Sequence, residues 1–248
     1  MTDSQTAEIQ KHIRCAPGDV ARSVLLPGDP ARAHRIGEQL EDARLVAENR
    51  EYVVITGKTN GVAVSVCSTG IGGSSAAIAL EELSNVGAEV FIRVGSAGGR
   101  RADIPIGSLV VVTAAYRGDG VSDEYLPLGF PAVADLEVNN ALIRAANELG
   151  ISAFSGIGTT RSAFYARHPE LNETLRRAGV VAAEMEAATL FIVGTLRGAK
   201  VGCVVATDSN IYLDAQPSLA EKEALYMQGE ALTIRTALRA AQLLEGRS

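Results

Sequence analysis

The chain has 248 residues, of which 47% are hydrophobic and 21% charged, and its formal net charge is −6 at pH 7. This composition supports a substantial buried core and excludes a disordered chain, and the acidic balance argues against a nucleic-acid-binding surface. No apolar run approaches the roughly 20 residues that a membrane-spanning helix needs, and the polar N-terminus does not resemble a signal peptide, so we expect no membrane partner.

Apolar, strand-like runs alternate with helical patterns along the chain. The runs that predict strands are residues 23–28, 51–57, 62–70, 89–95, 108–116, 151–158, 179–185 and 200–208. Helical patterns cover residues 74–87, 139–150, 186–198 and 218–246, and a further helix is expected after Pro30. Several strand-like runs are almost continuously apolar, which is typical of strands covered on both faces. The alternation predicts one α/β domain over residues 1–248, with a mostly parallel sheet flanked by helices and ligands beyond the carboxyl ends of its strands.

The first strand-like run ends in Gly28-Asp29-Pro30, and Arg32 falls within the first turn of the helix that follows. One interpretation is an ordinary strand-to-helix turn. The other is an anion site, because the N-terminus of a helix offers unpaired N–H groups and the positive end of the helix dipole. This stretch alone leaves both interpretations open.

Two further strand ends are rich in glycine. In residues 67–77, "CSTGIGGSSAA", glycines open a helix, and tight turns are the favoured interpretation for them. In residues 91–99, "FIRVGSAGG", Arg93 lies inside an apolar run and Ser96 lies among glycines. A buried guanidinium needs an anion, either a carboxylate of this acidic chain or a bound phosphate. Two arginines at two strand ends favour phosphate, which suits the planar fork of a guanidinium.

The last two strand ends are acidic. "GVVAAEMEAATL" places Glu184 and Glu186 on either side of Met185 where a strand becomes a helix. One carboxylate could accept hydrogen bonds from the two hydroxyls of a ribose, and N-capping of the helix is the alternative for the other. "VGCVVATDSN" ends with Asp208, which could act as a general acid or form an Asx turn.

The three cysteines, Cys15, Cys67 and Cys203, stand far apart in mostly apolar surroundings. Their spacing is not that of a metal site, so we expect no metal there. We interpret them as reduced, buried residues of a cytoplasmic protein.

Four motifs together carry a family resemblance. "LLPGDPAR", "RVGSAGG", "AAEMEAATL" and "ATDSN", in this order and spacing, resemble the hexameric-type nucleoside phosphorylases, a superfamily that includes bacterial purine nucleoside phosphorylase and uridine phosphorylase. The likeness extends from His12 to the final helix. It implies a central mixed, mostly parallel sheet and the reversible conversion of a nucleoside and phosphate into a free base and ribose or deoxyribose 1-phosphate. It also implies that phosphate is a co-substrate and that no metal or organic cofactor is needed.

The resemblance assigns roles to individual residues. The positions that match the phosphate site are Gly28, Arg32, Arg93 and Ser96, with Arg50 reaching the phosphate of a neighbouring subunit. The positions that match the ribose site are Met185 and Glu186, with His12 contacting the neighbour's ribose and Ile71 lying near the sugar. Phe164 matches an aromatic residue that packs against the base, and Asp208 matches the acid that serves N7 of a purine. Arg93 and Asp208 are the expected catalytic residues.

The resemblance also implies a homo-oligomer, expected to be a hexamer built as a trimer of dimers. On the base, "AFYARHPE" places His168 and Glu170 where the uridine enzymes carry the Gln and Arg that read uracil. Asp208 instead matches the Asp of the purine enzymes. In those enzymes this Asp pairs with a downstream Arg, and the nearest candidate for that position here is Lys222. Purine nucleosides are therefore favoured, and a uridine or broad-specificity phosphorylase is the alternative.

Two rival functions remain for such a site. A nucleoside hydrolase of the same fold would share the Glu and Asp motifs but has no need of Arg32, Arg50 and Arg93. A non-catalytic nucleoside-binding protein would keep Phe164 and gain nothing from a phosphate site built of three arginines. The arginines therefore favour phosphorolysis.

Overall fold

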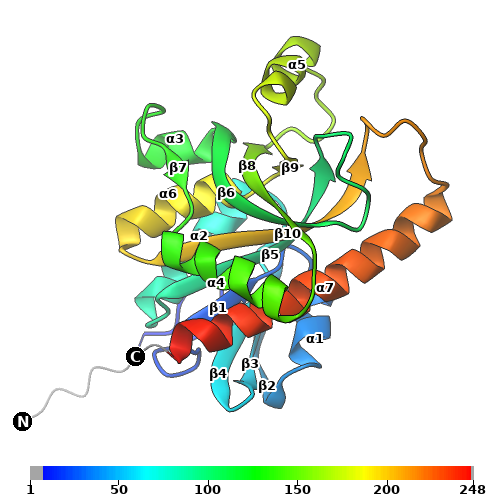
Figure 1. Ribbon diagram of the computed structural model, residues 1–248. Helices are drawn as coiled ribbons and strands as arrows, with labels where there is room; N and C mark the ends of the chain where they lie inside the picture. The colour runs from blue at the N-terminus through cyan, green and yellow to red at the C-terminus, as the bar shows by residue number, and fades with distance from the viewer. Residues whose placement is uncertain (1–7, 247–248) are drawn as a thin grey trace, which may run out of the picture.

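The computed structural model describes residues 8–246, so residues 1–7 of the polar N-terminal stretch lie outside the described part (Figure 1). The strands are β1 (Ser23–Leu26), β2 (Glu41–Asn49), β3 (Tyr52–Thr59), β4 (Val62–Cys67), β5 (Val90–Gly99), β6 (Leu109–Gly118), β7 (Ala132–Val133), β8 (Ala153–Arg161), β9 (Ala182–Glu184) and β10 (Lys200–Asn210). The helices are α1 (Pro30–Gly37), α2 (Gly73–Asn85), α3 (Val121–Tyr125), α4 (Leu136–Glu148), α5 (Pro169–Arg177), α6 (Ala187–Arg197) and α7 (Leu219–Glu245). In this part of the chain no helix is long and apolar enough to cross a membrane.

All strands and helices expected from the apolar runs are present, but four elements were missed. Strand β2 is charged and largely exposed, so it lacks the apolar run that identified the others. Strand β7 and helix α3 are very short. Helix α5 protrudes at the top of Figure 1 and has no buried residues, and its apolar face consists of only Leu171 and Leu175, which is too short a pattern to identify a helix.

The strands form one sheet in the order β10-β6-β8-β9-β5-β1-β4-β3-β2, with β7 beside β6. Parallel pairs run through its centre, joining β4, β1, β5 and β10, and also β6, β8 and β9. Antiparallel pairs form the β2–β3–β4 edge and join β10 to β6 and β5 to β9. Because β10 pairs with β5 as well as β6, part of the sheet closes into a barrel-like ring. The expected α/β fold with a mixed sheet is confirmed.

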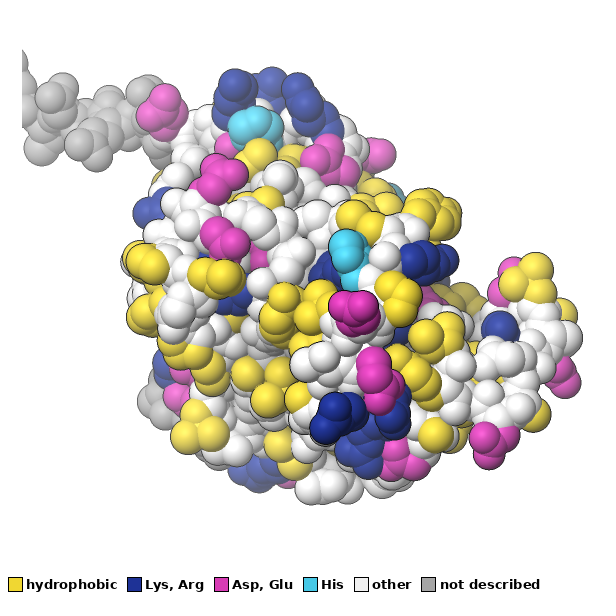
Figure 2. All heavy atoms as spheres, turned by 90° about the horizontal axis from the view of Figure 1, so that it is seen from above, with side chains coloured by type: hydrophobic (Ala, Val, Ile, Leu, Met, Phe, Trp, Pro, Cys, Tyr) yellow, Lys and Arg dark blue, Asp and Glu magenta, His cyan; other side chains and the backbone are white. Residues whose placement is uncertain are grey.

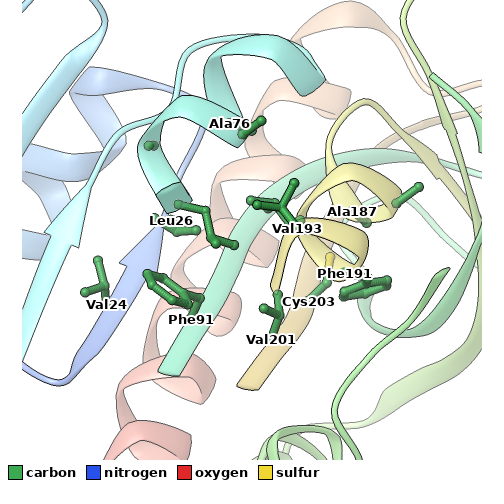
Figure 3. Close-up of a cluster of buried hydrophobic side chains, with 14 of the residues drawn as sticks. Val24, Leu26, Ala76, Phe91, Ala187, Phe191, Val193, Val201 and Cys203 are labelled. Atoms are coloured by element: carbon green, nitrogen blue, oxygen red, sulfur yellow. The ribbon is translucent and has the colours of Figure 1, made fainter. Parts of the chain in front are cut away.

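The two faces of the central strands are both covered by helices. Successive side chains of a strand point to opposite faces, so Val24 and Leu26 of β1 join Phe91 of β5 in a core cluster with α2 and α6 (Figure 3). Leu25 and Ile92, one position along, belong to a second cluster with α1, α4 and α7. Burial on both faces explains why these strands read as continuous apolar runs.

Candidate functional site

A cavity of about 1110 Å³ opens at the carboxyl ends of the central strands. It draws its walls from segments that are far apart in sequence, which follow or end β1, β4, β5, β8, β9 and β10. Nine of the residues expected to form the site line it, namely Gly28, Arg32, Ile71, Arg93, Ser96, Phe164, Met185, Glu186 and Asp208. The tertiary structure thus brings most of the predicted site residues into one space.

Arg32 enters the cavity from the first turn of α1. The side chain of Asp29 caps this helix by accepting a hydrogen bond from the N–H of Ala31 at 2.9 Å, and Pro30 suits its first position. Gly28 is needed before the cap, because a Cβ there would lie only 3.0 Å from the carbonyl oxygen of Gly70. The local sequence therefore starts the helix where Arg32 faces the cavity.

All three guanidinium nitrogens of Arg32 donate to groups of the protein. Its Nε donates to Oε2 of Glu230 at 2.7 Å, its Nη1 donates to the carbonyl of Val94 at 2.9 Å, and its Nη2 donates to the hydroxyl of Tyr226. Glu230 also accepts a hydrogen bond from Arg35 at 2.6 Å. Burial opposes the charge on Glu230, but the hydrogen bonds from the two arginines outweigh it and lower the pKa of this carboxyl. The site therefore fixes a buried positive charge in place.

Arg93 is buried in β5 and forms ion pairs with both acidic residues of the following motif. Its Nε donates to Oε2 of Glu184 at 2.9 Å, and its Nη2 pairs with Oε2 of Glu186. A Cβ on Gly95 would lie 2.9 Å from the guanidinium carbon, so glycine makes room for this side chain. Burial disfavours the charged form, but Glu186 and Glu184 outweigh it and raise the pKa of Arg93. Carboxylates therefore partner Arg93, which is the alternative that the sequence left open beside the favoured phosphate, and Arg93 still lines the cavity.

The two carboxylates of this motif have different surroundings. Oε2 of Glu184 accepts hydrogen bonds from the N–H groups of Glu186 and Ala187, both at 2.8 Å, and its Oε1 accepts one from the Thr160 hydroxyl at 2.5 Å. Glu184 therefore caps the start of α6, as expected for one of the pair. Glu186 lines the cavity and accepts a hydrogen bond from the N–H of Gly72 at 2.5 Å. Burial is the main cause that raises the pKa of Glu186, although Arg93 opposes it.

Asp208 lies at an irregularity of β10. Thr207 pairs with Ala97 of β5 and Ser209 pairs with Gly98, so Asp208 is an extra residue between two consecutive partners. Such a bulge redirects a side chain, and here the half-buried carboxyl lines the cavity and accepts a hydrogen bond from the Ser209 hydroxyl at 2.7 Å. Lys222, the candidate partner of Asp208 in the purine enzymes' pattern, is not among the cavity-lining residues.

The mouth of the cavity carries exposed apolar side chains. Phe164 is 70% exposed and Ile71 is 80% exposed, although both line the cavity. The Phe164 ring lies 5.1 Å from that of Tyr165 in an edge-to-face arrangement. Figure 2 looks down on the end of the molecule that carries α5, where hydrophobic side chains are interspersed with basic and acidic ones. These rings and aliphatic groups are available to a ligand or to another chain.

His12 and Arg50 do not line the cavity of their own chain. Nδ1 of His12 lies 2.6 Å from Oε1 of Glu82, and the carbonyl of His12 accepts a hydrogen bond from Asn49 at 2.7 Å. Arg50 is exposed at the turn between β2 and β3, with a φ of 56°. The site within one chain therefore lacks these two expected residues.

Sequence reasoning missed several polar residues of the cavity. They come from the ends of β5 and β8, from the segment after β8 and from α5, and they are Arg100, Thr159, Arg161, Arg167 and Asn172. The signal was present, because Arg161 and Arg100 stand directly at strand ends, where ligands of such sheets bind.

Comparisons with known proteins agree with one another. A family model described as the phosphorylase superfamily matches residues 22–245. The chain is 46% identical to the uridine phosphorylase of Thermococcus kodakarensis over 93% of this chain and 88% of that protein. It is 39% identical to the guanosine phosphorylase of Halorubrum lacusprofundi over 82% of this chain and 84% of that protein. The crystal structure of uridine phosphorylase from Vibrio fischeri superimposes with a TM-score of 0.90 at 33% identity, covering 96% of this chain and 99% of that one.

Proposed function

This chain belongs to the phosphorylase superfamily, and from that membership we propose that its cavity takes uridine as the preferred nucleoside. The protein is an enzyme, a nucleoside phosphorylase that transfers a pentosyl group between a base and phosphate. Purine nucleosides were favoured from the sequence because of Asp208, with uridine as the alternative. The relatives support the alternative better, since uridine phosphorylases recur among them. A guanosine phosphorylase among the relatives keeps a purine nucleoside as the second candidate.

The observation that carries phosphorolysis is that two buried arginines, Arg32 and Arg93, line the same cavity. In the proposed reaction, Arg32 and Arg93 hold phosphate together with Ser96 and the backbone at Gly28. A phosphate oxygen forms a bond to C1′ while the C1′–N bond breaks and its electron pair leaves with the base. Positive charge that develops on the sugar is stabilised by the phosphate below it and by Glu186, which also receives hydrogen bonds from the ribose hydroxyls.

The experiment that tests this function is base release from uridine and inosine with and without inorganic phosphate. We expect release to require phosphate and to produce ribose 1-phosphate in equal amount, with uridine consumed faster than inosine. Base release at an undiminished rate without phosphate would indicate a hydrolase. Binding of nucleoside without any release would indicate a binding protein.

The proposed phosphate site also predicts a stability effect at Glu230. A Glu230→Gln change leaves Arg32 buried without its carboxylate partner, and breaking a buried pair costs about 3–5 kcal/mol. Phosphate bound beside Arg32 would restore a negative charge, so phosphate should raise the melting temperature of this variant more than that of the native protein. Thermal unfolding in phosphate and in chloride of equal ionic strength measures the difference. A Glu173→Gln variant, which alters an exposed pair with Arg176, is the control. An equal phosphate shift in all three proteins would contradict a phosphate site at Arg32.

The active form is proposed to be a homo-oligomer, a hexamer arranged as a trimer of dimers. This proposal is supported by the positions of His12 and Arg50, which lie outside their own cavity, and by the exposed Phe164 and Ile71 at its mouth. Arg50 of a neighbouring subunit would complete the phosphate site, and His12 of a neighbouring subunit would complete the ribose site. The proposed reaction uses phosphate as co-substrate without a metal or organic cofactor. A cytoplasmic location is proposed from the three buried cysteines, which form no disulfide with one another.

Subunit mixing gives a prediction for this assembly. When assayed separately on inosine, the Arg50→Ala protein and the Asp208→Asn protein should each have low activity. The first lacks the arginine that each subunit supplies to its neighbour's phosphate site, and the second lacks the proposed general acid of its own site. Exchange of subunits should restore part of the activity, since some sites then receive a native Arg50 and a native Asp208. Activity is measured before and after mixing, with sedimentation to follow the oligomer. A fully active monomer would rule out the shared site.

A further inference from the structure

A tyrosine that the proposed reaction does not use contacts the buried arginine of α1. Tyr226 lies half-buried on α7 and is not among the residues that line the cavity. Its hydroxyl accepts a hydrogen bond from Nη2 of Arg32 and donates one to Oε2 of Glu230 at 3.0 Å. The hydroxyl of Ser96 forms a further hydrogen bond with it. Tyr226 therefore joins two residues that the proposed phosphate site takes from different elements, Arg32 from α1 and Ser96 from β5.

The packing of α7 fixes the position of this tyrosine. Tyr226 and Glu230 are one helical turn apart, so both side chains lie on the face of α7 that meets α1 (Figure 1). Gly229 brings the helix against the turn before β6, because a Cβ there would lie only 2.5 Å from the carbonyl oxygen of Gly107. This close backbone contact sets the level at which α7 presents Tyr226 to the site.

The hydrogen bonds around Arg32 form a closed ring. Nε and Nη2 of Arg32 donate to Glu230 and Tyr226, and the Tyr226 hydroxyl donates to the same oxygen of Glu230. A guanidinium is planar and has five N–H donors, and these bonds with the one to the carbonyl of Val94 occupy three of them. Since each of the three side chains in the ring contacts the other two, the ring sets the plane of the guanidinium and the direction of its remaining donors.

The hydroxyl of Tyr226 is used to its full capacity. A hydroxyl has one O–H donor and two lone pairs, and here the donor serves Glu230 while the oxygen accepts from Arg32 and Ser96. Burial is the main cause that raises the pKa of Tyr226 to about 12, so the phenol keeps the proton that it donates. Any rotation of this hydroxyl would break a hydrogen bond to at least one of its three partners.

Charge compensation does not depend on Tyr226. Glu230 is 2% exposed and already accepts hydrogen bonds from Arg32 at 2.7 Å and from Arg35 at 2.6 Å. Removal of the tyrosine hydroxyl would leave this buried carboxylate with both of its arginines. The contribution that only the hydroxyl makes is the link between Arg32 and Ser96.

We propose that Tyr226 is a positioning residue, whose hydroxyl holds Arg32 and Ser96 in the relative arrangement that binds phosphate. It acts through these two residues, since it does not line the cavity itself. Donors held in place bind an anion more tightly than mobile ones, because less side-chain freedom is lost on binding. The inference rests on the proposed phosphate site and goes beyond it by assigning part of the affinity for phosphate to α7.

Tyr226→Phe keeps the ring and removes only the hydroxyl. At saturating uridine, we expect the KM for phosphate to rise about tenfold, the order of effect of a lost hydrogen bond to a charged group. The KM for uridine and the melting temperature should stay close to native. A merely structural role would lower the melting temperature or the active fraction and leave the phosphate KM unchanged. A native phosphate KM in this variant would overturn the inference.

Tyr125→Phe is the matched control. Tyr125 of α3 is also half-buried, and its hydroxyl forms a hydrogen bond with the carboxylate of Glu81, outside the cavity. Loss of this hydroxyl should leave the KM for phosphate unchanged. An equal rise of the phosphate KM in both variants would show that contact with Arg32 and Ser96 is not the cause, and it would overturn the inference.

A double-substitution cycle tests the link to Ser96. Ser96→Ala alone should raise the KM for phosphate, because it removes a proposed ligand. Adding Tyr226→Phe to Ser96→Ala should raise it by a further factor of only about three or less, since the tyrosine hydroxyl then has no serine to hold. Two effects that multiply in full would overturn the link between Tyr226 and Ser96.

Binding of inorganic phosphate gives a readout that does not depend on turnover. In calorimetry without nucleoside, the Kd for phosphate should be about tenfold higher for Tyr226→Phe than for the native protein. An equal Kd would overturn the inference. Base release that needs no phosphate in the native protein would instead count against the phosphorylase, and the calorimetric comparison would still decide the role of Tyr226.

Discussion

Replacing Arg93 with methionine should cause the largest loss of both activity and stability in this protein. Arg93 is the proposed partner of phosphate in the transition state, and removing one such group costs on the order of 10²–10³ in kcat. The KM for phosphate should rise at the same time, with little change in the binding of free base. Steady-state rates with phosphate varied at saturating uridine would measure both effects.

The same substitution should lower the free energy of unfolding by about 3–5 kcal/mol, because it leaves two carboxylates buried without their arginine. The pKa of Glu186 is already raised by burial, and without Arg93 it should rise further. When the pKa of a carboxyl is higher in the folded protein than in the unfolded chain, the free energy of unfolding falls as pH rises through the folded pKa. In urea unfolding, the difference in free energy of unfolding between the variant and the native protein should therefore be smaller at pH 5 than at pH 8.

An Arg101→Met variant is the matched control for Arg93. Arg101 is the next arginine but one on the same segment, is 41% exposed and pairs with the exposed Asp103, so its loss should cost less than about 1 kcal/mol. A folded Arg93→Met protein with native kcat and native phosphate KM would contradict the proposed phosphate site.

Changing Asp208 to asparagine should separate purine from pyrimidine substrates. In a purine nucleoside the carboxyl would donate a proton to N7 as the glycosidic bond breaks, and asparagine cannot transfer a proton. Phosphorolysis of inosine should slow by roughly 10²–10⁴-fold, the span typical of general acid catalysis. Uracil has no N7, so cleavage of uridine should fall much less. Steady-state rates on both substrates provide the measurement.

Two nearby positions act as controls for Asp208. Asp214→Asn removes an exposed carboxyl beyond the end of β10 and should leave both substrates unaffected. Ser209→Ala removes the hydroxyl that donates to Asp208 and should have a smaller effect than the loss of the acid itself. Equal losses on inosine and uridine in Asp208→Asn would mean that this residue shapes the site without transferring a proton.

The central strands and their helices were predictable because burial leaves a direct mark on the sequence. A strand segment covered on both faces must be apolar at nearly every position, as β1, the first half of β6 and the middle of β10 are. The edge strand β2 has no such requirement, so its composition reads as a loop. Asn60 and Gly61 form the turn of the β3–β4 hairpin, with φ of 48° and 77°. An Asn-Gly pair predicts such a turn from its backbone preference, which a search for apolar runs does not consider.

The partners of the charged site residues could not be predicted from spacing. The sequence indicated that Arg93 needs an anion, and fold-level pairing of β5 with β9 decided that Glu184 and Glu186 both supply it. Glu230, the partner of Arg32, lies 198 positions away on a helix that carries no motif. Contacts between elements so distant in the chain depend on how the sheet and helices pack, which local patterns do not encode.

The sequence by itself determined which residues can carry the chemistry, because buried arginine, paired carboxylates and glycine at strand ends are each costly without a function or a partner. Only the tertiary structure decided how they are used. Pairing of β10 with β5, with one extra residue at Asp208, directs that carboxyl into the cavity, and closure of the ring brings Arg100 and Arg161 from two strands to one end of it. The physical reason is that hydrogen-bond register and packing across the sheet fix the direction of each side chain, and both depend on residues far away in the sequence.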